Sequence, residues 1–223
     1  MSIKEQQEEL FKRWCKARPG FCRDGIVCEE FYSDKKAKPK ILIVLKEANG
    51  NNETKDIVPW LKSFEEPGGD RVWDNVARWV YGIRNFMADG EILDWEKVPH
   101  TDPKFKRDSI KSICAMNLKK VPGGGVAEWK RLEAAADNNK EFIREQFGIY
   151  DPDLTICGNV GGLFMDAMDY GEFSRKTRRG INWHERETEK YVIDYWHPAN
   201  RGPNELLFYG LMDAVVEIYN RNR

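Results

Sequence analysis

The feature that most constrains the fold of this chain is a continuous apolar run in residues 40–45, Ile-Leu-Ile-Val-Leu after Lys40, which ends abruptly at the polar segment 46–50. A strand with one face in water alternates apolar and polar residues, whereas a strand without alternation is buried on both faces. Such strands are typical of the centre of a parallel sheet that helices cover on both sides. We expect residues 40–45 to form a strand of this kind.

Three further segments have the pattern of strands, and helical patterns separate them. The predicted strands are 40–45, 112–117, 154–157 and 191–196, with one more β-like segment near Trp183. The predicted helices are 71–87, 127–147, a short helix that ends near 168, and 205–219. This alternation predicts an α/β fold of three layers, α/β/α, around a central, mainly parallel sheet of about four strands.

The chain contains no linker, repeat or low-complexity tract, which predicts a single domain over residues 1–223. Its N-terminal segment has an amphipathic pattern with Leu10, Phe11 and Trp14 on one face. We expect residues 1–39 to form a helical extension that packs on the domain.

Bulk properties narrow the functional classes. No apolar run approaches the ~18 residues of a membrane span, and the N-terminus lacks the apolar core of a signal peptide. The five cysteines have no metal-ligand spacing and are expected to be free thiols. We therefore expect a cytoplasmic protein, monomeric, without a membrane partner, metal or cofactor. The net charge of −1 leaves nucleic acid open as a partner, provided that the positive charges cluster.

Ligands of open parallel sheets bind beyond the carboxyl ends of the strands. That rule selects four loops of this chain, residues 46–50, 118–125, 158–162 and 196–203. Three side chains in or next to these loops can do chemistry: Glu47, Asn117 and His197. We expect them to share one pocket, within roughly 10 Å of each other, the reach of a base, its sugar and a water.

Taken together, these loops resemble the motifs of the uracil-DNA glycosylase superfamily. Lys46-Glu-Ala-Asn-Gly50 is similar to the Gly-Glu-Ala-Pro-Gly of several branches, with Lys46 and Asn49 as departures. Asn117-Leu-Lys-Lys-Val-Pro-Gly123 is similar to the second motif, and Gly158-Asn-Val-Gly161 follows a strand as in the family. His197-Pro-Ala-Asn200 is similar to a His-Pro-Ser motif. The order and spacing agree from about residue 40 to 220.

The resemblance implies an enzyme that hydrolyses the N-glycosidic bond of a flipped, deaminated or damaged base of the uracil type in DNA. Glu47 would orient water or stabilise the oxocarbenium-like sugar, and His197 would donate to the charge that builds on the base. Asn117 offers a donor and an acceptor that can recognise the uracil edge. The remaining residues assigned to base binding are the stacking aromatic and the end of the first motif: Trp73, Asn49 and Gly50.

The resemblance also implies a DNA-binding surface. Arg201 is the long side chain available to enter the minor groove, and Asn200 follows the position of the phosphate-binding Ser, which is Ala199 here. Basic residues cluster around the second strand and before the fourth, and could form a phosphate track. Two basic residues just after the second predicted strand, Lys119 and Lys120, are assigned to DNA contact.

Each of these residues also has a purely structural interpretation. Glu47 could be solvated or paired with Lys46, Asn117 could cap its loop, His197 could be a satisfied structural histidine, and Trp73 could be core. Two other functions therefore stay open. One is a catalytically silent module on the same fold that binds nucleic acid, a nucleotide or a protein. The other is a nucleotide-cofactor enzyme that uses the Gly-rich turn 158–162 as a phosphate loop.

Overall fold

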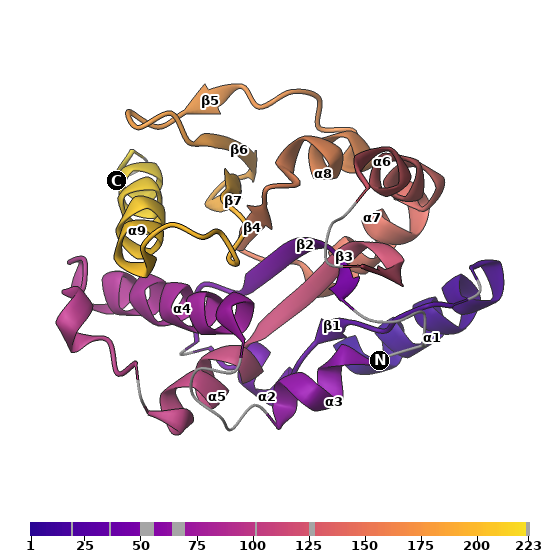
Figure 1. The fold of residues 1–223 in the computed structure, drawn as a ribbon, viewed down its shortest axis with the longest axis horizontal. Coiled ribbons are helices and arrows are strands. Elements are labelled where there is room, and N and C mark those ends of the chain that lie inside the picture. Colours follow the sequence, from indigo (N-terminus) through magenta and orange to yellow (C-terminus); the bar gives the residue numbers. More distant parts are fainter. Residues whose placement is uncertain are drawn as a thin grey trace.

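The computed structural model describes residues 1–18, 20–35, 37–49, 56–63, 70–100, 102–124 and 128–221. At the centre of this described part is one seven-stranded sheet with the strand order β1-β3-β2-β4-β7-β6-β5 (Figure 1). The strands are β1 (Gly25–Ile26), β2 (Ile41–Asn49), β3 (Ile113–Gly123), β4 (Leu154–Gly158), β5 (Arg175–Lys176), β6 (Asn182–Glu187) and β7 (Lys190–Tyr195).

The four central strands, β3, β2, β4 and β7, are parallel to one another. They correspond to the four predicted strands, and the prediction of an α/β fold around a mainly parallel sheet is confirmed. The count of about four strands is too low for the whole sheet, because β1, β6 and β5 extend its edges in antiparallel pairings. Two of these, β1 and β5, have two residues each, too few for any periodic pattern in the sequence.

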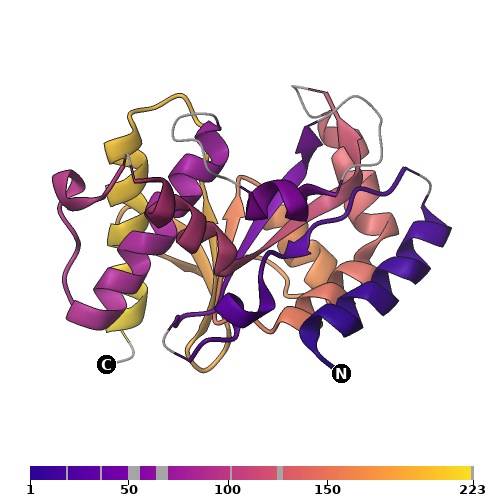
Figure 2. The same cartoon turned by 90° about the horizontal axis from the view of Figure 1, so that it is seen from below.

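Helices cover both faces of the sheet, as Figure 2 shows edge-on with α4 and α9 on one side and α1 on the other. We call the side of α4 the first face and the side of α1 the second face. The first face carries α3 (Ile57–Lys62), α4 (Arg71–Asp89), α5 (Pro103–Lys111) and α9 (Asn204–Asn220), with the 3-10 turn Trp95–Lys97 beside them. The second face carries α1 (Ile3–Ala17), α2 (Glu29–Tyr32), α6 (Trp129–Asn138), α7 (Lys140–Tyr150) and α8 (Gly161–Met168).

One predicted helix, 127–147, is in fact two helices, α6 and α7, that meet at Asn139. The Asn139 side-chain oxygen accepts hydrogen bonds from Trp14 Nε1 and Arg18 Nε, both at 3.0 Å. These partners come from α1 and the residue after it. The break is therefore a tertiary contact, which no pattern within 127–147 could reveal.

The N-terminal segment is more than the helical extension that the sequence predicts. Leu10, Phe11 and Trp14 of α1 are fully buried in the core of the second face, as their spacing indicates. Residues 25–26, however, form β1 and pair with β3 inside the sheet. Residues 1–39 are thus part of the central sheet and its core.

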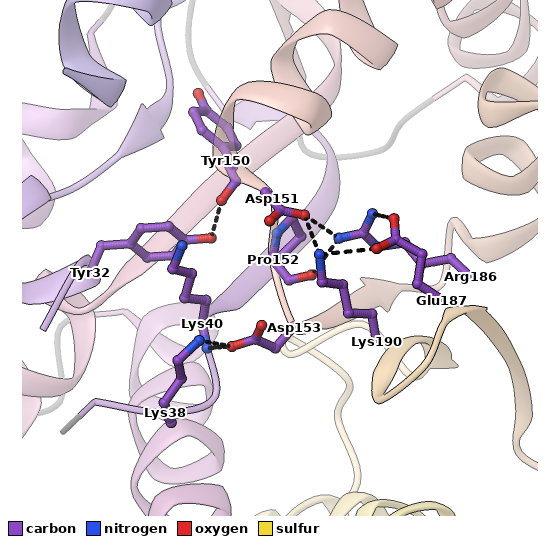
Figure 3. A network of polar contacts seen from close by, with 10 residues as sticks. All are labelled: Tyr32, Lys38, Lys40, Tyr150, Asp151, Pro152, Asp153, Arg186, Glu187 and Lys190. Atoms are coloured by element: carbon purple, nitrogen blue, oxygen red, sulfur yellow. Dashed lines mark hydrogen bonds and ion pairs between the residues drawn. The ribbon is translucent and has the colours of Figure 1, made fainter. Parts of the chain in front are cut away.

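A network of ion pairs joins the amino ends of the parallel strands (Figure 3). The Asp153 carboxylate, just before β4, accepts hydrogen bonds from the Lys40 backbone N–H at 2.8 Å and from Lys38 Nζ at 2.9 Å. The Asp151 carboxylate accepts from Lys190 Nζ at 2.7 Å and from Arg186 at 2.6 Å. The network thereby connects the starts of β2, β4 and β7.

At the opposite edge of the sheet, where the parallel strands end, two neighbouring strands continue to helices on opposite faces. From β2 the chain continues to α3 and α4 on the first face, whereas from the neighbouring β4 it continues to α8 on the second face. Where two adjacent strands lead to opposite faces, a crevice opens between their carboxyl ends, and ligands of such sheets bind there. In Figure 2 this edge lies at the end of the molecule away from both chain termini.

Candidate active site

His197 lies in the loop that follows β7 at the carboxyl edge. Its Nδ1 accepts a hydrogen bond from the Ala199 backbone N–H at 3.1 Å, and its carbonyl accepts one from the Asn200 N–H at 2.8 Å. Because Nδ1 must keep its lone pair to accept, the neutral ring carries its proton on Nε2. Burial, together with the positive charge of Lys46, lowers the pKa of His197 and favours this neutral form.

The His197 loop is held by hydrogen bonds from α4. Asn75, buried in α4, donates from Nδ2 to the Pro198 carbonyl at 2.7 Å. Arg71, in the first turn of α4, donates from Nε to the Asn200 carbonyl at 2.9 Å. The imidazole is therefore positioned by a helix on the first face of the sheet.

Gly158 at the end of β4 makes room for this loop. A Cβ atom at this position would lie 2.9 Å from Leu45 Cδ2 in β2, 3.1 Å from Pro198 Cδ and 3.6 Å from His197 Cα. A distance below 3.0 Å is too short for carbon atoms, so a side chain here would require the Leu45 side chain to shift and would crowd Pro198. The absence of a side chain at Gly158 lets the loop after β7 approach β2.

Glu47 faces β3 across the same edge. It is the register partner of Lys119, and its carboxylate forms an ion pair with Lys119 Nζ. The Glu47 side chain is only 9% exposed and packs against Gly123, where a Cβ atom would overlap with the carboxylate. The sequence allowed for a solvated Glu47 or a pair with Lys46. The structure shows Lys119 as the partner, while Lys46 lies 6.0 Å from the Trp129 ring.

Asn117 lies on the same side of β3 as Lys119, two residues earlier along the strand, and opposite Leu45 of β2. It is 5% exposed, and its backbone N–H donates to the Asp24 carboxylate at 2.7 Å. Its side-chain amide forms no hydrogen bond with another residue in the described ranges. The structure thus brings Glu47 and Asn117 onto one face of neighbouring strands, with the His197 loop beyond β4.

The prediction that Lys120 contacts DNA is wrong. Lys120 points to the second face, where its side chain is 1% exposed. Its ammonium donates to both oxygens of Asp24, at 2.6 and 2.7 Å, and to Gln146 at 2.8 Å. A buried lysine with three acceptors has no proton left for a phosphate.

Most of the basic residues that were expected to form a phosphate track are paired with carboxylates. Lys119 pairs with Glu47, so its predicted role in DNA contact is secondary to that ion pair. Before the fourth parallel strand, Arg178 pairs with Glu217 and Arg179 with Asp213. The other pairs join Lys104 to Asp108, Lys106 to Asp74, and Arg175 to Glu185. The positive charge at these positions is therefore largely neutralised.

The other predicted site residues lie as follows. Trp73 is 6% exposed in α4 and packs edge-on against Trp60, with ring centroids 6.4 Å apart, so it belongs to the core. Asn49 is the exposed last residue of β2. In the 196–203 loop, Arg201 is exposed, and the Asn200 side chain accepts from the Gly202 N–H at 2.8 Å. Gly50 lies outside the described residues.

Backbone N–H groups of the Gly-rich turn 158–162 already donate to acceptors within the protein. The Asp194 carboxylate of β7 accepts a hydrogen bond from the Gly161 N–H at 2.9 Å, at the start of α8. Asn159 donates its N–H to the Tyr195 carbonyl at 2.7 Å. The position where a phosphate would sit at a helix N-terminus is therefore filled by a carboxylate, which argues against a phosphate loop.

Comparison with known proteins adds no assignment: no family model and no curated protein sequence matches the chain. Within the described residues, no group of three or more His, Cys, Asp or Glu side chains could hold a metal ion. No helix in the same part of the chain has the length and hydropathy needed to cross a bilayer.

Sequence reasoning missed the residues that position the site. Asn75 and Asp24 are polar and almost fully buried, at 1% and 0% exposed. Asn75 is a polar residue within an apolar helical face, and this conflict was a usable signal because buried polar groups need partners. Asp24 had no such signal, since its partners Lys120 and Gln146 come from distant segments.

Proposed function

We propose that this protein is a DNA glycosylase-like enzyme, which hydrolyses the N-glycosidic bond of a flipped uracil-type base in DNA. The observation that supports it most is the neutral His197, whose Nδ1 accepts from the Ala199 N–H and whose Nε2–H is left to donate. Breaking this bond leaves negative charge on the departing base. A fixed donor aimed at that charge lowers the barrier without reorganisation.

The two other residues complement the donor. The Glu47 carboxylate would stabilise positive charge on the sugar, and its ion pair with Lys119 keeps it in one orientation. Asn117 would recognise the base edge with its amide, which has both a donor and an acceptor to offer. A base can reach these groups at the carboxyl edge of the sheet only after it has left the stack of the DNA.

The direct test is base release from uracil-containing oligonucleotides, single-stranded and duplex. We expect His197→Ala to slow release by roughly 10²-fold or more, the usual cost of a lost donor to a developing anion. The matched control is His184→Ala on β6, the antiparallel strand between β7 and β5, which should release base at the parental rate. A parent protein without activity on any deaminated base would contradict the proposal.

Gly158→Ala tests whether the close approach of the His197 loop matters. The added methyl group would collide with Leu45 and Pro198, and we expect release to slow by up to about 10²-fold, the cost of misplacing a reacting group by an ångström. The control is Gly162→Ala in the next helix, because a Cβ atom there meets nothing within 4 Å. Equal rates for both variants would show that the loop position does not contribute.

A catalytically silent binding module is the second candidate, and the ion pair of Glu47 favours it. A carboxylate that is paired with Lys119 and packed on Gly123 has little freedom to activate water. Lys119→Met separates the two functions. If Glu47 is catalytic, the variant should still release base at an altered rate. If the module is silent, parent and variant both lack activity while nucleic acid binding persists.

A further inference from the structure

Three of the eight tryptophans of the chain are exposed, and all three follow carboxyl ends of parallel strands. Trp60, Trp129 and Trp196 are 44%, 48% and 54% exposed. Trp60 lies in α3 after β2, Trp129 begins α6 after β3, and Trp196 directly follows β7. Exposed large aromatic surface is unfavourable in water, so its concentration at one edge of the sheet indicates a binding surface.

Two of the rings, Trp129 and Trp60, are connected through neighbouring residues to the loop that begins with Trp196. Lys46 Nζ lies 6.0 Å from the centroid of the Trp129 ring, and the charge of Lys46 also acts on His197, the neighbour of Trp196. On the other side, Arg71 holds the Asn200 carbonyl of the same loop. Two residues further along α4, Trp73 contacts Trp60. The arc therefore runs from Trp129 past the His197 loop to Trp60, and two cations lie along it.

We propose that this arc of Trp60, Trp129 and Trp196 is a stacking platform for unpaired bases, and that the enzyme takes single-stranded DNA in preference to duplex. This inference rests on the proposed function and names the form of its substrate. Aromatic rings separated by cations are suited to a single strand, whose bases stack on the rings while the phosphates contact the cations.

The arrangement fits other partners less well. In a duplex the faces of the bases are covered by their neighbours, so flat rings cannot stack on them. A protein interface of ordinary size has a contiguous apolar centre from which charged residues are depleted. Here Lys46 and Arg71 lie among the tryptophans.

The test measures binding of a labelled oligodeoxythymidine that contains no uracil, against a duplex of the same length. We expect the single strand to bind more tightly, and each of Trp60→Ala, Trp129→Ala and Trp196→Ala to weaken its binding between about 5-fold and 150-fold. The corresponding Trp→Phe variants should keep most of the affinity, because phenylalanine also stacks. Phe31→Ala is the matched control, since Phe31 is 36% exposed and has Lys111 Nζ 5.8 Å from its ring, but lies in α2, away from the three tryptophans.

Several results would overturn the platform: parental affinity in all three variants, an equal loss in Phe31→Ala, or tighter binding of the duplex by the parent. Loss of a dimer as the only effect of the Trp→Ala variants would identify a second copy of the chain as the occupant instead. Because the oligonucleotide has no base to release, its binding is independent of catalysis. A protein that binds the single strand but releases no uracil would refute the proposed function and keep the platform.

Discussion

The histidine at the carboxyl edge illustrates how a few atoms set the chemistry of a residue. The sequence indicates that His197 is a candidate because it follows a strand and precedes a proline, but neither feature reveals its tautomer. The Ala199 N–H determines the tautomer, and burial with the Lys46 charge determines the direction of the pKa shift. Both the tautomer and the direction of the pKa shift therefore depend on the folded loop.

The residue-scale prediction concerns this pKa. In the native protein it should lie below the ordinary value of about 6.5, so His197 stays neutral at pH 7. Unfolded chains bind the proton more strongly, so stability should fall as pH decreases from about 6.5 through the native pKa. Lys46→Gln removes a positive charge and should raise the pKa, as NMR titration of the imidazole would measure. An unchanged pKa in Lys46→Gln, with Lys12→Gln as a remote control, would contradict the electrostatic assignment.

The middle of β3 shows how an element can depend on residues far from it in sequence. The strand β3 pairs with β1 only at Cys114 and Ala115. The backbone N–H of Asn117, two residues further on, donates instead to the Asp24 carboxylate. The same carboxylate binds Lys120 and Gln146 within the core of the second face. Strand, helix and loop are thereby joined at Asn117, in the middle of β3.

We expect Asp24→Asn to destabilise the protein by about 3–5 kcal/mol, because it leaves the Lys120 ammonium buried without its charge partner. Replacing both residues, Asp24→Leu with Lys120→Met, should recover only the part of this loss that comes from the unpaired ammonium, because the Asn117 N–H and the Gln146 amide still lose their acceptor. The control is Glu9→Gln in the exposed pair with Lys12, which should change the stability far less because solvent screens this pair. Urea unfolding measures all three, and similar losses for both single variants would contradict the prediction.

At the scale of the whole molecule, the sequence predicts the parallel sheet and its two helical layers. The prediction succeeds because buried strands and amphipathic helices are local patterns, such as residues 40–45. It fails for β1, for the break at Asn139 and for the pairing of Lys120. Each of these depends on a contact between segments about a hundred residues apart, or on an element too short to have a period.

The amino-edge network provides the prediction at this scale. Burial alone would raise the pKa of Asp151, but hydrogen bonds from Lys190 and Arg186 outweigh it and lower the pKa. Its contribution to stability should therefore be complete above pH ~4 and disappear as pH falls through the lowered native pKa. Asp151→Asn should lower the melting temperature at pH 7 and converge with the parent toward pH ~2. A difference that is independent of pH would show that the charge of Asp151 is not responsible.

The hydrogen bonds from α4 to the His197 loop have a consequence for the order of folding. Asn75 and Pro198 are 123 residues apart in sequence, and Arg71 and Asn200 are 129 apart. Contacts of such separation form late, because a long loop must close before they stabilise anything. On the ribosome, α4 emerges long before its partner loop, so the nascent chain can complete most of its sheet before the candidate site is assembled. The candidate site would then be complete only when β7 has joined β4 and the following loop has reached α4.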